Sequence, residues 1–205
     1  MARRAAEILD TIEADADYPR FGHATLAHLD YATFTGFPIV ANFDLDKDGP
    51  ALFVDAMRVM ALKAAVYELT RDEQRAELLV PAPVDEMIHA AVAQFTLLAR
   101  IQARTGVDFV HAPDLKRFDY DTRCYTDLAY EAAGWGTPNP RYWIGQQETA
   151  RRLGLLRADY EAIGIFDFGR HEHDFEATAR RENDLAGHRY RPRGWWAGID
   201  DAGPA

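Results

Sequence analysis

The sequence predicts a mainly α protein: a single-domain helical bundle with loops rich in proline and glycine and an irregular C-terminal tail. Apolar residues recur every three or four positions along most of the chain, which is the spacing of a buried helix face. Proline and glycine separate these periodic stretches, as they do at helix ends. A strand-like alternation is found at residues 165–168, and four residues are weak support for a sheet.

The N-terminal part of the chain predicts two helices. The first covers residues 2–14 and carries one apolar side, formed by Ala5, Ile8, Leu9 and Ile12. The second is a weaker helical pattern over residues 21–34, which Gly36 and Pro38 interrupt.

A longer helix is expected from Pro50, which stands where the first residue of a helix belongs, to about Leu69. Its apolar residues recur at helical spacing: Phe53, Met57, Met60, Ala64 and Tyr67. A short helix over residues 71–79 follows, before Pro81 and Pro83.

The clearest helix of the sequence runs from Pro83 to Thr105. Proline opens it, Asp85 and Glu86 occupy the first turn, where the helix dipole favours acidic side chains, and Gly106 ends it. Its expected buried stripe consists of Val84, Ile88, Ala91, Phe95 and Leu98. Later helices are expected over residues 120–133, 140–153, 158–163 and 174–185.

Composition restricts the class of protein. Cys124 is the one cysteine, which excludes an internal disulfide and a multi-cysteine zinc site and suits a reducing cytoplasm. The formal charge of −10 argues against nucleic acid and anionic membranes as partners. The first residues do not read as a signal peptide, and no apolar run reaches the ~18 residues of a membrane span. We therefore expect a cytoplasmic protein.

Three residues form a candidate metal site. Asp85 and His89 are four residues apart, so on a helix they stack on one side, at the border of the apolar stripe. The loop after Gly106 returns His111 toward the same helix. Two imidazoles and a carboxylate are the ligand set of non-haem iron and also suit zinc, and they leave positions open for water, substrate or dioxygen. Alternatively, Asp85 stabilises the helix start and the histidines merely form hydrogen bonds.

The segments around these residues resemble a known family. Val84-Asp85 with Ile88-His89, followed by Phe109 to Pro113 (FVHAP), is similar to the bacterial glycine-rich-domain-containing-protein-like family, which shows Val-Asp, two residues, Trp-His and, after a helix, His-His-x-Pro. A later part of the resemblance is carried by Ala132-Ala133-Gly134-Trp135 and Tyr142-Trp143.

The resemblance covers about residues 50–145 and implies a shared structural or chemical role for Asp85, His89 and His111. This chain departs from the family pattern at four positions, where Ile88, Val110, Leu98 and Gln102 replace Trp, His, an aromatic residue and Cys.

Other segments carry weaker signals. His171 and His173 could chelate an ion from an extended segment, with His188 joining them, but a surface cluster at a helix start explains them too. The segment 44–55 fits a calcium loop except for Asp at its twelfth position, and an Asp-rich turn explains the same residues. The segment 148–164 has a helix-turn-helix pattern, which the acidic chain around it disfavours.

The expected organisation is a helical domain over residues 1–186 and an arginine- and tryptophan-rich tail over residues 187–205. Trp195 and Trp196 are costly to leave in water, so the tail is expected to dock on the body or on a partner subunit, which suggests a homodimer. Arg189 and Tyr190 are the predicted catalytic residues, which would close a pocket over an anionic substrate. Alternatively, the tail is only a docked structural clasp.

The function predicted from these features is that of a small metal-dependent enzyme acting on a small polar, carboxylate-bearing molecule. Its metal would be held by Asp85, His89 and His111, with iron preferred and zinc as the alternative. The other interpretation is a non-catalytic helical interaction or structural module, in which the same residues only tie a helix to its following loop.

Overall fold

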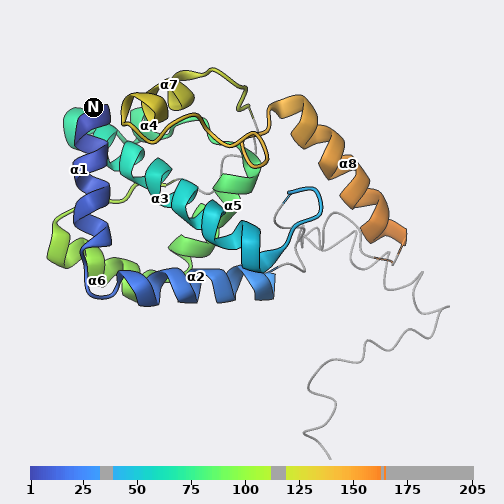
Figure 1. The fold of residues 1–205 in the computed structure, drawn as a ribbon, viewed down its shortest axis with the longest axis horizontal. Helices are drawn as coiled ribbons and strands as arrows, with labels where there is room; N and C mark the ends of the chain where they lie inside the picture. The colour runs from blue at the N-terminus through green and yellow to red at the C-terminus, as the bar shows by residue number, and fades with distance from the viewer. Residues whose placement is uncertain (33–38, 112–118, 163, 165–205) are drawn as a thin grey trace, which may run out of the picture. The chain divides into compact units, whose positions relative to one another are not determined.

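The computed structural model describes residues 1–32, 39–111, 119–162 and 164 (Figure 1). The elements in chain order are α1 (Ala2–Glu13), α2 (Tyr18–Ala32), α3 (Leu45–Thr70), α4 (Glu73–Ala76), α5 (Ala82–Val92), α6 (Phe95–Thr105), α7 (Tyr125–Ala132) and α8 (Gln146–Ala162). The described residues contain no strand, and the mainly α fold predicted from the sequence is confirmed. The helix expected over residues 174–185, the segment 165–168 and the tail 187–205 lie outside the described residues.

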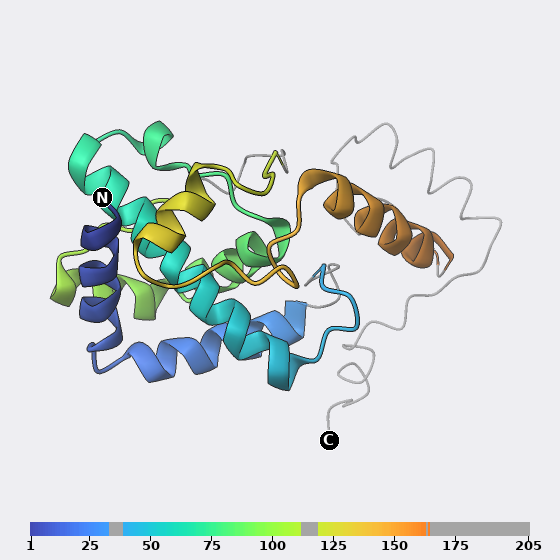
Figure 2. The ribbon, with the colours of Figure 1, turned by 45° about the horizontal axis from the view of Figure 1, so that its top comes forward.

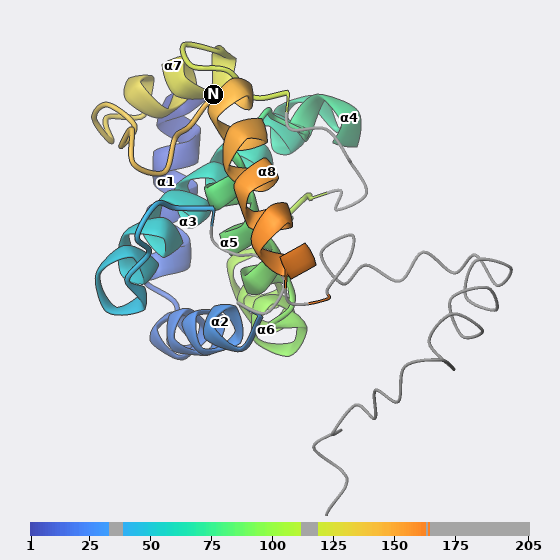
Figure 3. The same ribbon diagram turned by 90° about the vertical axis from the view of Figure 1, so that its right-hand side faces the viewer.

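Helix α3 is the element on which the bundle is built. It contacts α1, α2, α4, α5 and α7, and it lies between α1 and α5 in Figure 1. Side chains such as Leu52, Met57 and Leu62 are completely buried, and they share one core with Ile8 and Ile12 of α1. Helix α2 packs beside both α5 and α6 (Figure 3). No helix in the described part of the chain is both long and apolar enough to cross a membrane.

Helix α3 begins at Leu45, before the predicted start at Pro50. The carboxylate of Asp44 caps it by accepting hydrogen bonds from the backbone amides of Asp46 and Lys47, at 3.1 and 3.3 Å. A side-chain oxygen at this position satisfies amides that the first helical turn leaves without a partner. Pro50 therefore lies inside the helix. Because residues 45–55 are helical, the calcium-loop interpretation of this segment is wrong.

The single helix predicted from Pro83 to Thr105 is two helices. It is interrupted between α5 and α6 at Gln94, whose φ of −82° and ψ of 42° are not helical. The interruption changes the side that α6 presents to the core, and Phe95, expected in the buried stripe, is 76% exposed. The other four members of the stripe are buried.

Further helix boundaries differ from the predictions: α2 begins at Tyr18 instead of residue 21, and α4 covers only Glu73–Ala76 of the expected 71–79. Helix α7 begins at Tyr125, later than residue 120, so that Cys124 precedes the helix and is half-buried. Helix α8 runs without interruption from Gln146 to Ala162, where the sequence suggested two helices or a helix-turn-helix. Its Leu153 packs against a small apolar cluster that includes Ile39 and Ile144.

The chain between α7 and α8 runs along α3 (Figure 2). A buried carboxylate of α3 attaches it there. Asp48 accepts two hydrogen bonds from the guanidinium of Arg141, both at 2.7 Å, and a third from the hydroxyl of Tyr142 at 2.7 Å. The Arg141 guanidinium holds the pKa of Asp48 well below its usual range.

A second buried carboxylate of α3, Asp55, binds the same region. It accepts hydrogen bonds from the Tyr130 hydroxyl at 2.7 Å and from the Trp143 indole at 2.9 Å. Burial raises the pKa of Asp55, against the effect of these two donors. Asp48 and Asp55 together fix the position of residues 141–143 on α3.

Candidate metal centre

Helix α5 presents Asp85 and His89 one turn apart. Val84 and Ile88, each next to one of them in the sequence, are fully buried and hold the helix against the core. Asp85 and His89 consequently lie at the edge of the core, with side chains that are 24% and 32% exposed. This is the border position that the helical spacing predicted.

The loop after α6 brings His111 to these two side chains. Gly106 ends α6 with a φ of +69°, a conformation that glycine adopts without strain, and the next residue, Val107, is buried. The rings of His89 and His111 have centroids 4.9 Å apart and an interplanar angle of 57°. The structure thus brings together all three residues that the sequence singled out as metal ligands.

The spacing of the donor atoms can be compared with that of a metal site. One potential ligand atom from each of Asp85, His89 and His111 lies within 4.8 Å of the other two. Bonds of about 2.0–2.1 Å to zinc would place tetrahedral ligand atoms roughly 3.4 Å apart. The cluster therefore has the right donors, and its ligand atoms need to approach one another by up to about 1.4 Å, which side-chain rotation of half-buried residues can provide.

His89 is oriented by an acidic neighbour. Its Nδ1 lies 3.4 Å from Oε2 of Glu86, and its Nε2 lies 3.7 Å from Oδ2 of Asp85. The hydrogen bond with Glu86 and the nearby charge of Asp85 raise the pKa of His89, while burial opposes them. When the N–H of Nδ1 donates a hydrogen bond to Glu86, the lone pair of Nε2 is directed away from Glu86. Metal-binding histidines commonly have such a carboxylate partner.

His111 has a different neighbour on its Nδ1. The Nζ of Lys63 lies 3.1 Å from this nitrogen. Burial lowers the pKa of His111 to about 3, with smaller contributions from the charges of Lys63 and His89. The imidazole is therefore neutral at pH 7, as a metal ligand must be.

Lys63 and Glu77 belong to the same cluster and were not singled out from the sequence. The side chain of Lys63 is only 1% exposed, and its ammonium donates a hydrogen bond to Oε2 of Glu77 at 2.7 Å. A signal was nevertheless present, because Lys63 stands between Met60 and Ala64 of the apolar face predicted for this helix. A buried lysine requires a partner, so a charge in that position indicates a polar cluster inside the fold.

The charges of the cluster favour a cation. Around the two imidazoles stand the carboxyl groups of Asp85, Glu86 and Glu77 and the ammonium of Lys63. Acidic side chains thus outnumber the one lysine around the two imidazoles, which suits a bound cation. Burial raises the pKa of Asp85, and the positive charges of its neighbours oppose this effect.

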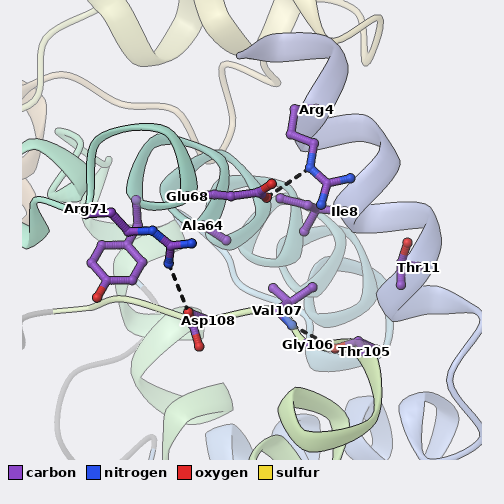
Figure 4. Close-up of a pocket in the computed structure, with 11 residues that line it drawn as sticks. Arg4, Ile8, Thr11, Ala64, Glu68, Arg71, Thr105, Gly106, Val107 and Asp108 are labelled. Atoms are coloured by element: carbon purple, nitrogen blue, oxygen red, sulfur yellow. Dashed lines mark hydrogen bonds and ion pairs between the residues drawn. The ribbon is translucent and has the colours of Figure 1, made fainter.

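A separate pocket of about 220 Å³ lies between α1, the end of α3 and the loop after α6 (Figure 4). Its rim carries two ion pairs, Arg4 with Glu68 at 2.9 Å and Arg71 with Asp108 at 3.6 Å. Among the described residues, those that line it include none of the three candidate ligands. Both arginines of the rim are already paired with acids, and we assign no function to this pocket.

The remaining candidates lie outside the described residues. These are the predicted catalytic residues Arg189 and Tyr190 and the histidines His171, His173 and His188. Their relation to the candidate metal centre stays a prediction.

Comparison with known proteins identified no relative: no family model, no curated protein and no solved structure matches this chain. The resemblance to the bacterial glycine-rich-domain-containing-protein-like family stays a prediction. The same holds for the shared role that this resemblance implies for Asp85, His89 and His111.

Proposed function

We propose that the protein binds a divalent metal ion through Asp85, His89 and His111 and uses it to act on a small polar molecule. The observation that supports this proposal is a pair of buried imidazole nitrogens. Nε2 of His89 and Nε2 of His111 are inaccessible to water and have no hydrogen-bond partner among the described residues. An unpaired buried polar atom costs about 1–3 kcal/mol, and an ion between these nitrogens and Asp85 would remove that cost.

The donor set indicates the class of ion and of site. One carboxylate and two imidazoles suit iron or zinc, and we retain iron as the first choice because this set is that of non-haem iron sites. Three protein ligands leave positions for water and substrate, where the ion would act as a Lewis acid or, in the case of iron, bind dioxygen. A closed structural site would contain four protein ligands.

The protein keeps the ligand side chains of α5 in fixed orientations. Glu86 holds the ring of His89 through Nδ1, and the two residues share helix α5 with Asp85, so these three side chains keep their relative positions. The proposal that the substrate carries a carboxylate rests on Arg189 and Tyr190 of the tail.

A non-catalytic structural role is the second candidate, and one observation favours it. Lys63 of α3 forms hydrogen bonds with Glu77 and His111, so that these side chains connect α3 directly with two loops. In that case the protein is a helical interaction module.

Metal analysis of the full-length chain, purified without a histidine tag, separates the two functions. We expect close to one equivalent of iron or zinc in the wild type, and its loss in His89→Ala and in Asp85→Asn with the helical circular dichroism retained. His23→Ala is the matched control, since His23 is exposed on α2 and should keep the metal. A metal-free wild type that binds neither ion, with its unfolding temperature unchanged by either, would establish the structural module instead.

A further inference from the structure

Lys63 occupies an unusual position for a charged residue. Its side chain is 1% exposed, and its Nζ lies 2.7 Å from Oε2 of Glu77 and 3.1 Å from Nδ1 of His111. The three residues come from α3, from the end of α4 and from the loop after α6. A buried ammonium is costly unless its hydrogen bonds are satisfied, so these contacts define where Lys63 is held.

The hydrogen-bonding capacity of an ammonium determines the state of His111. An ammonium donates and cannot accept, so Nδ1 of His111 is the acceptor. A neutral imidazole carries one proton, which must then be on Nε2. That nitrogen has no lone pair to offer an ion, while the lone pair of Nδ1 is already used by Lys63.

His89 shows the opposite arrangement. Its Nδ1 faces the carboxylate of Glu86, which can only accept when it is ionised, so in the neutral ring of His89 the proton is on Nδ1 and the lone pair is on Nε2. One imidazole of the candidate metal centre is thus ready to bind an ion, whereas the other is occupied by an ammonium.

We propose that Lys63 competes with the metal ion for His111 and thereby sets the affinity of the candidate metal centre. An ion binds His111 only after the contact between Lys63 and His111 is broken. Lys63 then still has the carboxylate of Glu77, so its charge does not become unpaired. This inference rests on the proposed function, because it concerns the same three ligands.

The test compares zinc affinities of the metal-free, full-length chain by competition with a chromophoric chelator. Lys63→Met removes the donor and keeps an unbranched side chain, and we expect it to bind zinc at least about tenfold more tightly. Lys63→Arg keeps a hydrogen-bond donor, and its zinc affinity should remain within a few-fold of that of the wild type. Glu77→Gln should weaken binding, because Lys63 then has no ionised carboxylate to hold it when it leaves His111.

A spectroscopic measurement on the wild type is independent of whether these variants fold. Imidazole ¹⁵N chemical shifts of the metal-free protein should place the proton of His111 on Nε2 and that of His89 on Nδ1. The hydrogen bond from Lys63 requires this tautomer of His111, so the measurement tests the contact on which the competition depends, and the zinc affinities then separate competition from a structural role. A proton on Nδ1 of His111 overturns the inference.

The outcomes distinguish the two proposals. Zinc binding by the wild type with equal or weaker binding by Lys63→Met overturns the competition and leaves the proposed function intact. Binding by Lys63→Met alone supports the competition and contradicts the proposed function of the wild type. If neither protein binds zinc or iron, both proposals are wrong.

Discussion

Asp48 and Asp55 are buried carboxylates on the same helix, yet their pKa values shift in opposite directions. The difference follows from their partners. Asp48 accepts hydrogen bonds from the guanidinium of Arg141, which stabilises the ionised carboxylate. Asp55 accepts hydrogen bonds from the neutral donors of Tyr130 and Trp143, its contact with the Arg58 guanidinium is longer at 3.7 Å, and burial dominates. Ionisation of Asp48 therefore favours the folded state, and ionisation of Asp55 opposes it.

This difference leads to a prediction about acid stability. Asp48 has a lower pKa in the folded than in the unfolded chain. Its ionised carboxylate therefore contributes fully to the free energy of unfolding above the unfolded pKa of about 3.9, and this contribution declines as the pH falls below that value. Asp48→Asn should lower the free energy of unfolding by about 2 kcal/mol at pH 7. In urea titrations, the difference in free energy of unfolding between Asp48→Asn and the wild type should decrease as the pH is lowered from roughly 4 to 2.

The matched control for this prediction is Asp46→Asn, since Asp46 lies in the same turn of α3 and is exposed. It should show little change in stability at any pH. A difference between Asp48→Asn and the wild type that does not vary with pH would contradict the assigned role of Arg141.

At the scale of single residues, the sequence predicted that the three candidate ligands lie close together. The four-residue spacing of Asp85 and His89 and the glycine before the loop of His111 are local signals, and they suffice to bring the three side chains together. Lys63 and Glu77 come from other segments. Their approach depends on how α3 and α4 pack, which no local pattern contains.

At the scale of elements, the sequence predicted which segments are helical better than where helices end. The interruption between α5 and α6 contains Ala93 and Gln94, and neither residue disfavours a helix strongly. It arises from packing, because α6 has to turn its own apolar side toward the core. The start of α3 was predicted too late for a different reason. Proline is common at the first helical position, which favoured Pro50, but Asp44 is the stronger start signal because its side chain caps the helix.

The interruption can be tested by comparing two positions of α6. A continuous helix would bury both Phe95 and Leu98, whereas the structure exposes Phe95 and buries Leu98. Phe95→Gln should change the free energy of unfolding by no more than about 0.5 kcal/mol, and Leu98→Ala should lower it by about 2–4 kcal/mol. Chemical denaturation measures both values. A large loss of free energy of unfolding in Phe95→Gln would mean that Phe95 is buried, as the prediction of one continuous helix requires.

At the scale of the whole molecule, the candidate metal centre joins segments that are distant in the sequence. Asp85 and His89 belong to α5, and His111 follows α6, so an ion bound to all three would connect two separate parts of the bundle. Binding to the folded state alone stabilises it by mass action.

Zinc should consequently raise the unfolding temperature of the wild type. At a free zinc concentration of about 100 times Kd the gain is about 2.7 kcal/mol, which corresponds to roughly 5–10 °C for a chain of this length. Differential scanning fluorimetry should show this increase, its reversal by a chelator and its absence in His111→Ala. His23→Ala should retain it, and an equal increase in His111→Ala would place the ion elsewhere.

The two carboxylates of α3 have a mechanical consequence for the region that follows α7. Asp48 and Asp55 are seven residues apart, which is close to two helical turns, so they point to the same side of α3 about 10 Å apart. If either set of hydrogen bonds breaks, the other still holds residues 141–143 against α3. The chain is thus anchored to the bundle shortly before α8, which starts at Gln146.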